Sequence, residues 1–323
     1  MKKHLIILRH NSGKGGHGRL ANQLWNFMSI YAYALERGYD LENYSFFEYH
    51  DCFQIPPVRN FPVRCLFFSP FPFLAKKFGQ TRAAIFTRKV YKLYVMAVRL
   101  RHGKTLLNSY NSPDIAGIFY LPPSEPARPA LQKLEDNPRI KNIYFDGWLF
   151  RNPAGVMKYH SEILEYFKPK DETRKTIAAF MEPLKTQYDN LVGVHIRQDD
   201  YKTFKGGRYF VEQARIREIL DEYLREFKKD PEHTCFIITS NGPIKREIFQ
   251  GLHFEISNLG FIEDLFLLAS CTAIIGSDSS FGNFAAYYGN TPHIVFQKEP
   301  MDWEYYAGKT KYFWNKYCTL VHF

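Results

Sequence analysis

Short apolar runs and helical periodicities alternate along the C-terminal half of the chain. Two runs rich in β-branched residues, Leu191–Arg197 and Cys235–Ser240, are typical of buried strands. Between them, apolar residues recur with a helical period over residues 209–228. Further strands are expected at Ala273–Gly276 and His293–Phe296, and further helices at Pro243–Gln250, Asp264–Cys271 and Ser280–Tyr288. Strands that alternate with helices predict a parallel sheet.

The N-terminal half begins with the same alternation, so we expect a second α/β domain there. A boundary near Pro169 would give domains at residues 1–168 and 169–323. In the first domain we predict a strand at Leu5–Leu8, a glycine-rich loop at Ser12–Gly18, a helix at residues 20–37 closed by Gly38, a helix at about 81–101, a strand at Asn142–Gly147 and a short helix at about 154–166.

Positive charge is concentrated in one segment of the first domain. The formal net charge is +10, and residues 52–113 contain no Asp or Glu. Nine Phe and Tyr residues lie between Arg59 and Lys104, a mixture that suits a membrane surface or an anionic polymer. A solvated basic helix face over an aromatic core explains the pattern equally well. The eleven basic residues are Arg59, Arg64, Lys76, Lys77, Arg82, Arg88, Lys89, Lys92, Arg99, Arg101 and Lys104.

Several classes of protein are excluded by missing patterns. The uncharged stretch Leu20–Leu35 has 16 residues, whereas a membrane span needs about 20 mostly apolar residues. The five cysteines are widely spaced and never form a Cys-x-x-Cys pair, which favours buried, reduced thiols. The apolar run at Leu5–Leu8 is too short for a signal-peptide core, so we expect a cytoplasmic location, with contact at the inner membrane face as an extension. Sequence templates for hydrolases, kinases and metalloenzymes find no match, and no Asp-x-Asp pair is present to hold a cation.

A glycine-rich loop offers one cofactor hypothesis. Residues 13–18 fit the pattern G-x-G-x-x-G, and Asp40 lies 22 positions beyond Gly18, where a ribose-binding acid would be expected in a dinucleotide fold. Four residues separate this loop from the preceding strand, although the first glycine should follow the strand directly. A nicotinamide-dependent oxidoreductase therefore stays open as an alternative that depends on this loop alone.

Two polar motifs follow predicted strands in the second domain. Arg197 can hold a phosphate through two parallel N–H bonds, or it can form an ion pair with Asp199 or Asp200. Ser279 and Ser280 begin a predicted helix, whose N–H groups could bind a second anionic group. An ordinary helix cap by Ser279 or Asp278 is compatible with that interpretation.

Taken in order, five segments resemble the successive motifs of the alpha-1,2-fucosyltransferases of glycosyltransferase family 11, relatives of the alpha-1,6- and protein O-fucosyltransferases. The segments are Gly18–Gln23, Tyr144–Trp148, His195–Tyr201, Asp264–Cys271 and Ser279–Phe281. The resemblance implies a GT-B-like α/β fold with two Rossmann-like domains facing each other across a cleft. It also implies GDP-fucose as donor substrate, inversion at the anomeric carbon, and no metal or other cofactor.

The resemblance also implies roles for individual residues. Arg197 matches the first arginine of a His-x-Arg-Arg motif and would bind the donor pyrophosphate, with Gln198 in place of the second arginine. Asn22 matches the asparagine of a Gly-Asn-Gln element that faces the phosphates. The donor site then comprises His195, Arg197, Gly18, Asn22, Asn241, Asp264, Ser279, Ser280 and Phe281.

The reaction expected from this resemblance is transfer of L-fucose to a hydroxyl of a glycan. Asp200 is the candidate base for that hydroxyl, and orientation of Arg197 by an ion pair is the alternative role. The acceptor we expect is a lipid-linked glycan in bacterial surface polysaccharide synthesis, with an alpha-1,2 linkage. Another donor sugar, or a non-catalytic protein that binds anions through residues 59–104, stays open.

Overall fold

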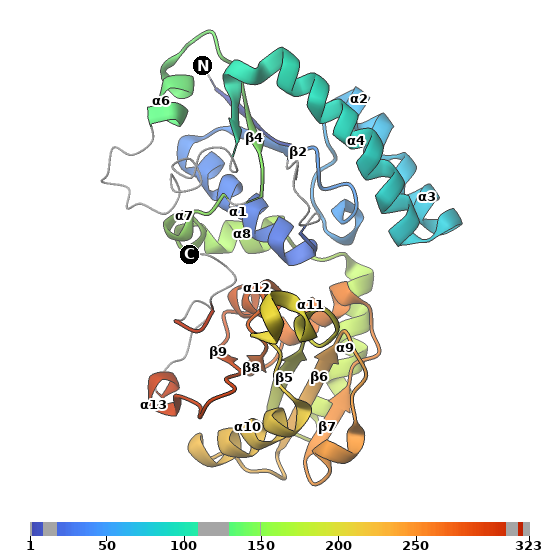
Figure 1. Ribbon diagram of the computed structural model, residues 1–323, viewed down its shortest axis with the longest axis vertical. Coiled ribbons are helices and arrows are strands. Elements are labelled where there is room, and N and C mark those ends of the chain that lie inside the picture. The colour runs from blue at the N-terminus through green and yellow to red at the C-terminus, as the bar shows by residue number, and fades with distance from the viewer. Residues whose placement is uncertain (1, 9–17, 109–128, 149, 308–315, 319–323) are drawn as a thin grey trace. The chain divides into compact units, whose positions relative to one another are not determined.

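The computed structural model describes residues 2–8, 18–108, 129–148, 150–307 and 316–318 of the 323-residue chain (Figure 1). The chain divides between Lys170 and Asp171 into two compact units. Each unit is built on a parallel β-sheet, so the predicted α/β fold is confirmed.

The first unit contains a four-stranded sheet in the order β2-β1-β4-β3. Its strands are β1 (His4–Ile7), β2 (Asp40–Asn43), β3 (Leu106–Asn108) and β4 (Asn142–Asp146), and every neighbouring pair is parallel. Helix α1 (Leu20–Arg37) ends as predicted at Gly38, whose φ of 64° is readily adopted only by glycine.

Asp40 contradicts the dinucleotide-binding alternative. It is the first residue of β2, where it pairs in register with His4, and its carboxylate lies 2.8 Å from Lys2 Nζ. Nucleotides bind at the carboxyl ends of parallel strands, whereas Asp40 lies at the amino end. The expectation that Asp40 binds a ribose is therefore wrong, and Gly13 to His17 of the glycine-rich loop lie outside the described residues.

Residues 61–102 of the basic segment fold into helices. These are α2 (Phe61–Val63), a π-helical turn at Arg64–Phe68, α3 (Pro70–Phe78) and α4 (Gln80–His102), which contains the predicted helix at 81–101. Tyr91, Val95 and Val98 on one side of α4 pack with Phe47 and Phe67 in the core of the first unit. No helix in the described part of the chain is long and apolar enough to cross a membrane.

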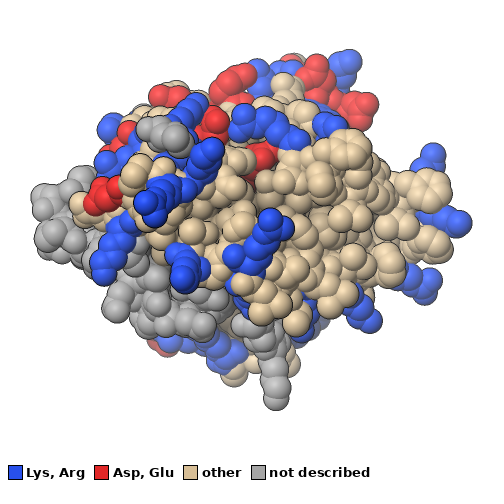
Figure 2. Space-filling model, turned by 90° about the horizontal axis from the view of Figure 1, so that it is seen from above, with Lys and Arg blue, Asp and Glu red and all other residues tan. Residues whose placement is uncertain are grey.

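Three of the eleven basic residues in this segment have acidic partners from outside it. Arg59 lies 3.6 Å from Asp40, Arg88 pairs with Glu48, and Arg99 pairs with Asp146. The expectation of eleven uncompensated charges is therefore wrong for these three, because the fold brings other segments to them. Among the described residues, no ion pair is found for the other eight. At the right-hand end of Figure 2, over α3, Lys and Arg surround uncharged side chains and no Asp or Glu is visible.

The first unit also contains α6 (Pro129–Asp136), α7 (Pro153–Lys158) and α8 (His160–Tyr166). The single helix predicted at 154–166 is thus two helices, which break at Tyr159. None of the five cysteines, all within the described residues, forms a disulfide bond, and Cys65 is exposed rather than buried as predicted.

The second unit contains a five-stranded parallel sheet in the order β7-β6-β5-β8-β9. The strands are β5 (Asn190–Ile196), β6 (Thr234–Ser240), β7 (His253–Ile256), β8 (Ala273–Gly276) and β9 (His293–Val295). The helices are α9 (Asp171–Lys185), α10 (Gln213–Glu226), α11 (Phe261–Ala269), α12 (Ser280–Gly289) and α13 (Trp303–Tyr306).

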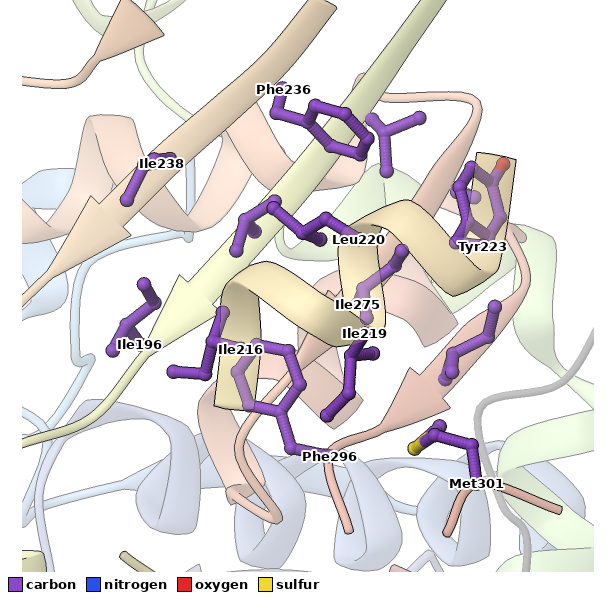
Figure 3. Close-up of a cluster of buried hydrophobic side chains, with 14 of the residues drawn as sticks. Ile196, Ile216, Ile219, Leu220, Tyr223, Phe236, Ile238, Ile275, Phe296 and Met301 are labelled. Carbon is purple, nitrogen blue, oxygen red and sulfur yellow. The ribbon is translucent and has the colours of Figure 1, made fainter. Parts of the chain in front are cut away.

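Helices cover both faces of this sheet. Figure 3 shows α10 against one face, with Ile216 on the side of Ile196 and Leu220 on the side of Phe236. On the opposite face, a Cβ added to Gly193 would lie 2.8 Å from Leu268 of α11. Glycine at this position therefore allows α11 to pack closely on β5.

Two predicted helices of this unit need correction. The helix expected at 209–228 begins only at Gln213, because Glu212 is extended (ψ 144°) and the ring of Tyr209 packs against Tyr201 and Phe204. The helix expected at Pro243–Gln250 is only a 3₁₀ turn at Arg246–Phe249.

Candidate functional site

The order of the strands in the second unit locates the candidate site. From β5 the chain adds β6 and β7 on one side and β8 and β9 on the other. In open α/β sheets, ligands bind at the carboxyl ends of the strands where the order reverses in this way. His195 of β5 pairs in register with Gly276 of β8. The residues that follow these two strands therefore meet at the expected binding edge.

Arg197 lies directly after β5 and is held at both its backbone and its side chain. Its N–H donates to Ser277 Oγ at 3.0 Å. Its Nε donates to one carboxylate oxygen of Asp200 at 3.0 Å, and its Nη2 donates to the other. Asp200 belongs to a 3₁₀ turn at Asp199–Lys202, so the ion-pair partner left open between Asp199 and Asp200 is Asp200.

The ring of Tyr201 supports the same guanidinium. Arg197 Cζ lies 4.5 Å from the ring centroid, a distance suited to cation–π attraction. The Tyr201 hydroxyl donates to the Asp278 carbonyl at 2.6 Å, which ties this ring to the loop after β8. Burial alone would lower the pKa of Arg197, but the hydrogen bonds and charges of Asp200 and Tyr201 together outweigh burial, and this pKa is raised. Arg197 is therefore a fixed positive charge at every working pH.

Helix α12 begins beside this arginine. Ser279 Oγ accepts the N–H of Phe281 at 3.1 Å, so the predicted helix cap is formed by Ser279. Ser279 and Ser280 are both buried. The N-terminus of a helix favours negative charge. Binding of an anion by these two serines stays a prediction that is compatible with the cap.

His195 is the buried neighbour of Arg197. Its Nδ1 lies 3.3 Å from Thr239 Oγ1, and its ring stacks on Phe281 with centroids 5.0 Å apart. Burial, followed by the charge of Arg197, lowers the pKa of His195 to about 3. His195 is thus neutral at pH 7, and it supports Phe281 rather than adding charge to the site.

Asn241 and Gln198 organise the neighbouring loop after β6. Asn241 Oδ1 accepts the backbone N–H of Gln198 at 2.8 Å. The Gln198 side chain donates to Ser240 Oγ at 3.0 Å and to the Pro243 carbonyl at 2.9 Å. Asn241 therefore fixes the chain next to Arg197, and the nucleoside contact predicted for it remains untested.

Asp264 lies in the first turn of α11, next to the end of β7. Its carboxylate accepts a hydrogen bond from Ser257 Oγ at 2.5 Å, and Ser257 N–H donates to the Ile238 carbonyl of β6. Burial raises the pKa of Asp264 from 3.8 to about 6. Asp264 is at the predicted sheet edge, and a donor contact remains a prediction.

The raised pKa of Asp264 gives a testable dependence of stability on pH. The folded protein binds this proton more tightly than the unfolded chain, so the stabilisation is complete below about pH 4 and is lost as pH rises through about 6. Asp264→Asn stays neutral and keeps an acceptor for Ser257. We expect this variant to be more stable than the unmodified protein at pH 8, by up to about 2 kcal/mol, with a difference that shrinks below pH 6.

Thermal unfolding at several pH values measures this difference. Asp189→Asn is the matched control because Asp189 is exposed. If the stability difference between Asp264→Asn and the unmodified protein does not change with pH, the pKa of Asp264 is not raised in the folded protein.

Gly18 and Asn22 belong to the first unit, at the start of α1. The Gln23 side chain donates to the Gly18 carbonyl at 3.2 Å. A Cβ on Gly18 would lie 2.9 Å from Asn22 Cβ, so the close approach of these residues requires glycine. Asn22 is half-buried. The phosphate contact predicted for it remains a prediction.

Three residues of the site have roles that the sequence did not indicate. Tyr201 ends the quoted motif His195–Tyr201, and Ser277 directly follows the predicted strand Ala273–Gly276, but nothing in their spacing shows that they hold Arg197. Gln198 was noted only as a departure from a second arginine. Within the described residues, no group of three His, Cys, Asp or Glu side chains is arranged to hold a metal ion.

Comparisons with known proteins agree with this arrangement. The model of the family described as Glycosyl transferase family 11 matches residues 140–315, which is more than half of the chain. A search of the curated proteins found no match.

Three solved structures share the fold over most of their lengths. A mutant of Arabidopsis thaliana FUT1 in complex with GDP has 14% identity and a TM-score of 0.56, with 94% of this chain and 72% of that chain covered. POFUT1 in complex with GDP has 12% identity and a TM-score of 0.51, with 91% and 98% covered. The fucosyltransferase NodZ from Bradyrhizobium has 17% identity and a TM-score of 0.51, with 94% and 97% covered. The chain therefore has a GT-B-like α/β fold and belongs to glycosyltransferase family 11.

Proposed function

We propose that this glycosyltransferase moves L-fucose from GDP-fucose to a hydroxyl of a glycan, with inversion and without a metal ion. The observation that carries this proposal is Arg197 at the binding edge of the sheet: Asp200 and Tyr201 fix its partly buried guanidinium, and Ser277 accepts its backbone N–H. Two of the structural relatives, FUT1 and POFUT1, are complexes with GDP, which supports a guanosine diphosphate leaving group.

The proposed chemistry needs positive charge at the leaving group. As the bond between the anomeric carbon and the phosphate oxygen breaks, its electron pair moves to the diphosphate while positive charge develops on the sugar ring. Arg197 and the N-terminal turn of α12 are aimed at this edge and would stabilise the departing diphosphate. These groups would supply, without a metal ion, the positive charge that a metal ion otherwise provides at the diphosphate.

The proton of the acceptor hydroxyl must leave as the new bond forms. Both oxygens of Asp200 accept hydrogen bonds from Arg197, and an ion-paired carboxylate is a weak base. We therefore favour the orienting role for Asp200 over the base role that was the other alternative.

For the acceptor, the proposal names a class of glycan and a linkage. The resemblance to alpha-1,2-fucosyltransferases supports an alpha-1,2 linkage to a surface glycan built on a lipid carrier. The five cysteines form no disulfide bond with one another, which fits a reducing compartment such as the cytoplasm.

A donor screen tests the sugar and the nucleotide. We expect transfer or slow hydrolysis with GDP-fucose but not with UDP-sugars or GDP-mannose. GDP should raise the melting temperature because it binds only the folded protein, whereas NADH should leave it unchanged. Activity with another donor and none with GDP-fucose would overturn the donor assignment, and stabilisation by NADH alone would overturn the reaction class.

The same assay in excess chelator tests the metal-independent step. We expect unchanged transfer, because the charges at the proposed phosphate site belong to the chain itself. Activity that is lost with EDTA and restored by Mn²⁺ or Mg²⁺ would contradict this part of the proposal.

A further inference from the structure

The outward side of helix α4 is apolar, which is unusual for a surface helix. Its inner side already packs in the core of the first unit through Tyr91, Val95 and Val98. On the opposite side, Leu93 and Leu100 are 66% and 89% exposed. Ile85, Phe86, Val90 and Met96 are exposed as well. The helix thus has two apolar sides, and only one of them is covered by the core.

Neighbouring elements extend this apolar surface. Phe73 and Phe78 of α3, Leu66 of the π-helical turn and Phe61 of α2 are all at least half exposed. Helices α3 and α4 pack side by side (Figure 1). We call these ten exposed residues the apolar surface: Phe61, Leu66, Phe73, Phe78, Ile85, Phe86, Val90, Leu93, Met96 and Leu100.

Basic residues lie among and around the apolar surface. Arg82 and Lys89 are seven positions apart on the outward side of α4, Lys92 lies at its border, and all three are exposed. Lys77 Nζ lies 5.3 Å from the ring of Phe78, at the end of α3. In the described residues these cations have no carboxylate within ion-pair distance, unlike Arg88 and Arg99, which point to the inner side.

We propose that the apolar surface docks on an anionic phospholipid bilayer, with its Lys and Arg residues at the level of the headgroups. Helices that lie in a membrane interface combine apolar side chains with flanking Lys and Arg in this way. The long stems of Lys and Arg let the charge reach phosphate while apolar neighbours enter the acyl region. Segment 52–113 contains no acidic residue to oppose this contact.

This inference is independent of the sugar that is transferred. It concerns a surface of the first unit, whereas Arg197 and its partners belong to the second. Docking would place the enzyme where acceptors on lipid carriers are found.

Vesicle flotation tests the proposal with the full chain. We expect binding to mixed phosphatidylcholine–phosphatidylglycerol vesicles, little binding to pure phosphatidylcholine, and loss of binding as salt is raised. The triple variant R82E/K89E/K92E should weaken binding by more than about 100-fold, because each cation near the surface contributes about fivefold. The variant L93S/L100S should also weaken binding, and its residual binding should remain salt-dependent.

The control is a triple variant with the same change in net charge, K133E/K175E/K245E, at exposed positions elsewhere. It should bind vesicles almost as well as the unmodified chain. All variants should keep the increase in melting temperature with GDP, which separates vesicle binding from the donor site. The exposed thiol of Cys65 gives a second measurement, since a polarity-sensitive dye there should shift to the blue on vesicles.

Three outcomes would overturn the proposal. The unmodified chain could fail to bind anionic vesicles, or the control could lose as much binding as R82E/K89E/K92E. In the third outcome, the unmodified chain sediments as a dimer and the variant L93S/L100S as a monomer. The apolar surface would then bind a second copy of the chain and not a bilayer.

Discussion

Arg197→Lys is expected to lower turnover by about 10²–10³-fold although the charge is kept. The guanidinium donates to Asp200 through two different nitrogens and packs on the ring of Tyr201. A lysine ammonium cannot form this planar, two-point contact and still present N–H groups to a diphosphate. The loss corresponds to about 3–4 kcal/mol of transition-state stabilisation. Steady-state kinetics with GDP-fucose measure it.

The matched control is Arg139→Lys, which makes the same change at an exposed position of the first unit. It should have normal turnover. The melting temperature of Arg197→Lys should stay close to that of the unmodified protein, but its increase with GDP should be smaller. Near-normal turnover in folded Arg197→Lys would remove this residue from the mechanism.

Asp200→Asn, measured in the same assay, separates the two roles of Asp200. An asparagine Oδ1 still accepts one N–H from Arg197, so an orienting residue should lose only part of the activity and keep the pH profile. A general base should lose about 10²–10⁴-fold together with the acidic limb of that profile.

The sequence predicts the central strands better than the outer ones. Strands β5, β6 and β8 are buried on both faces and read as apolar runs. Strand β2, with the sequence DLEN, and β7, with HFEI, lie at the edges of their sheets and are partly exposed. Edge strands tolerate charged residues, so neither of them leaves an apolar pattern to recognise.

The same distinction applies to the site. Arg197 and Ser279 each follow a buried strand, and this alone places both residues at one edge of the sheet. The register of His195 with Gly276 confirms that placement. The choice between Asp199 and Asp200 depends on the local turn. A 3₁₀ turn brings residues three positions apart to the same side, which selects Asp200 as the partner of Arg197.

Arg99→Ala is expected to destabilise the protein by about 3 kcal/mol. Arg99 Nε donates to Asp146 at 2.7 Å, and the Asp146 side chain, at the end of β4, is fully buried. Removing the arginine leaves a buried carboxylate without its cation, which costs far more than the loss of a surface ion pair. Urea denaturation of the full chain measures the change in the free energy of unfolding.

Lys92→Ala on the same helix is the contrasting control, because Lys92 is exposed and should change stability by less than about 0.5 kcal/mol. The double variant R99A/D146N removes the buried charge as well and should recover part of the loss, since the two residues form one interacting pair. If R99A and R99A/D146N are equally unstable, the loss comes from the packing of the Arg99 side chain on α4 and not from the charge of Asp146. If R99A loses no more stability than Lys92→Ala, the ion pair of Arg99 with Asp146 does not stabilise the fold. Arg99 would then count among the cations that we propose to contact lipid headgroups.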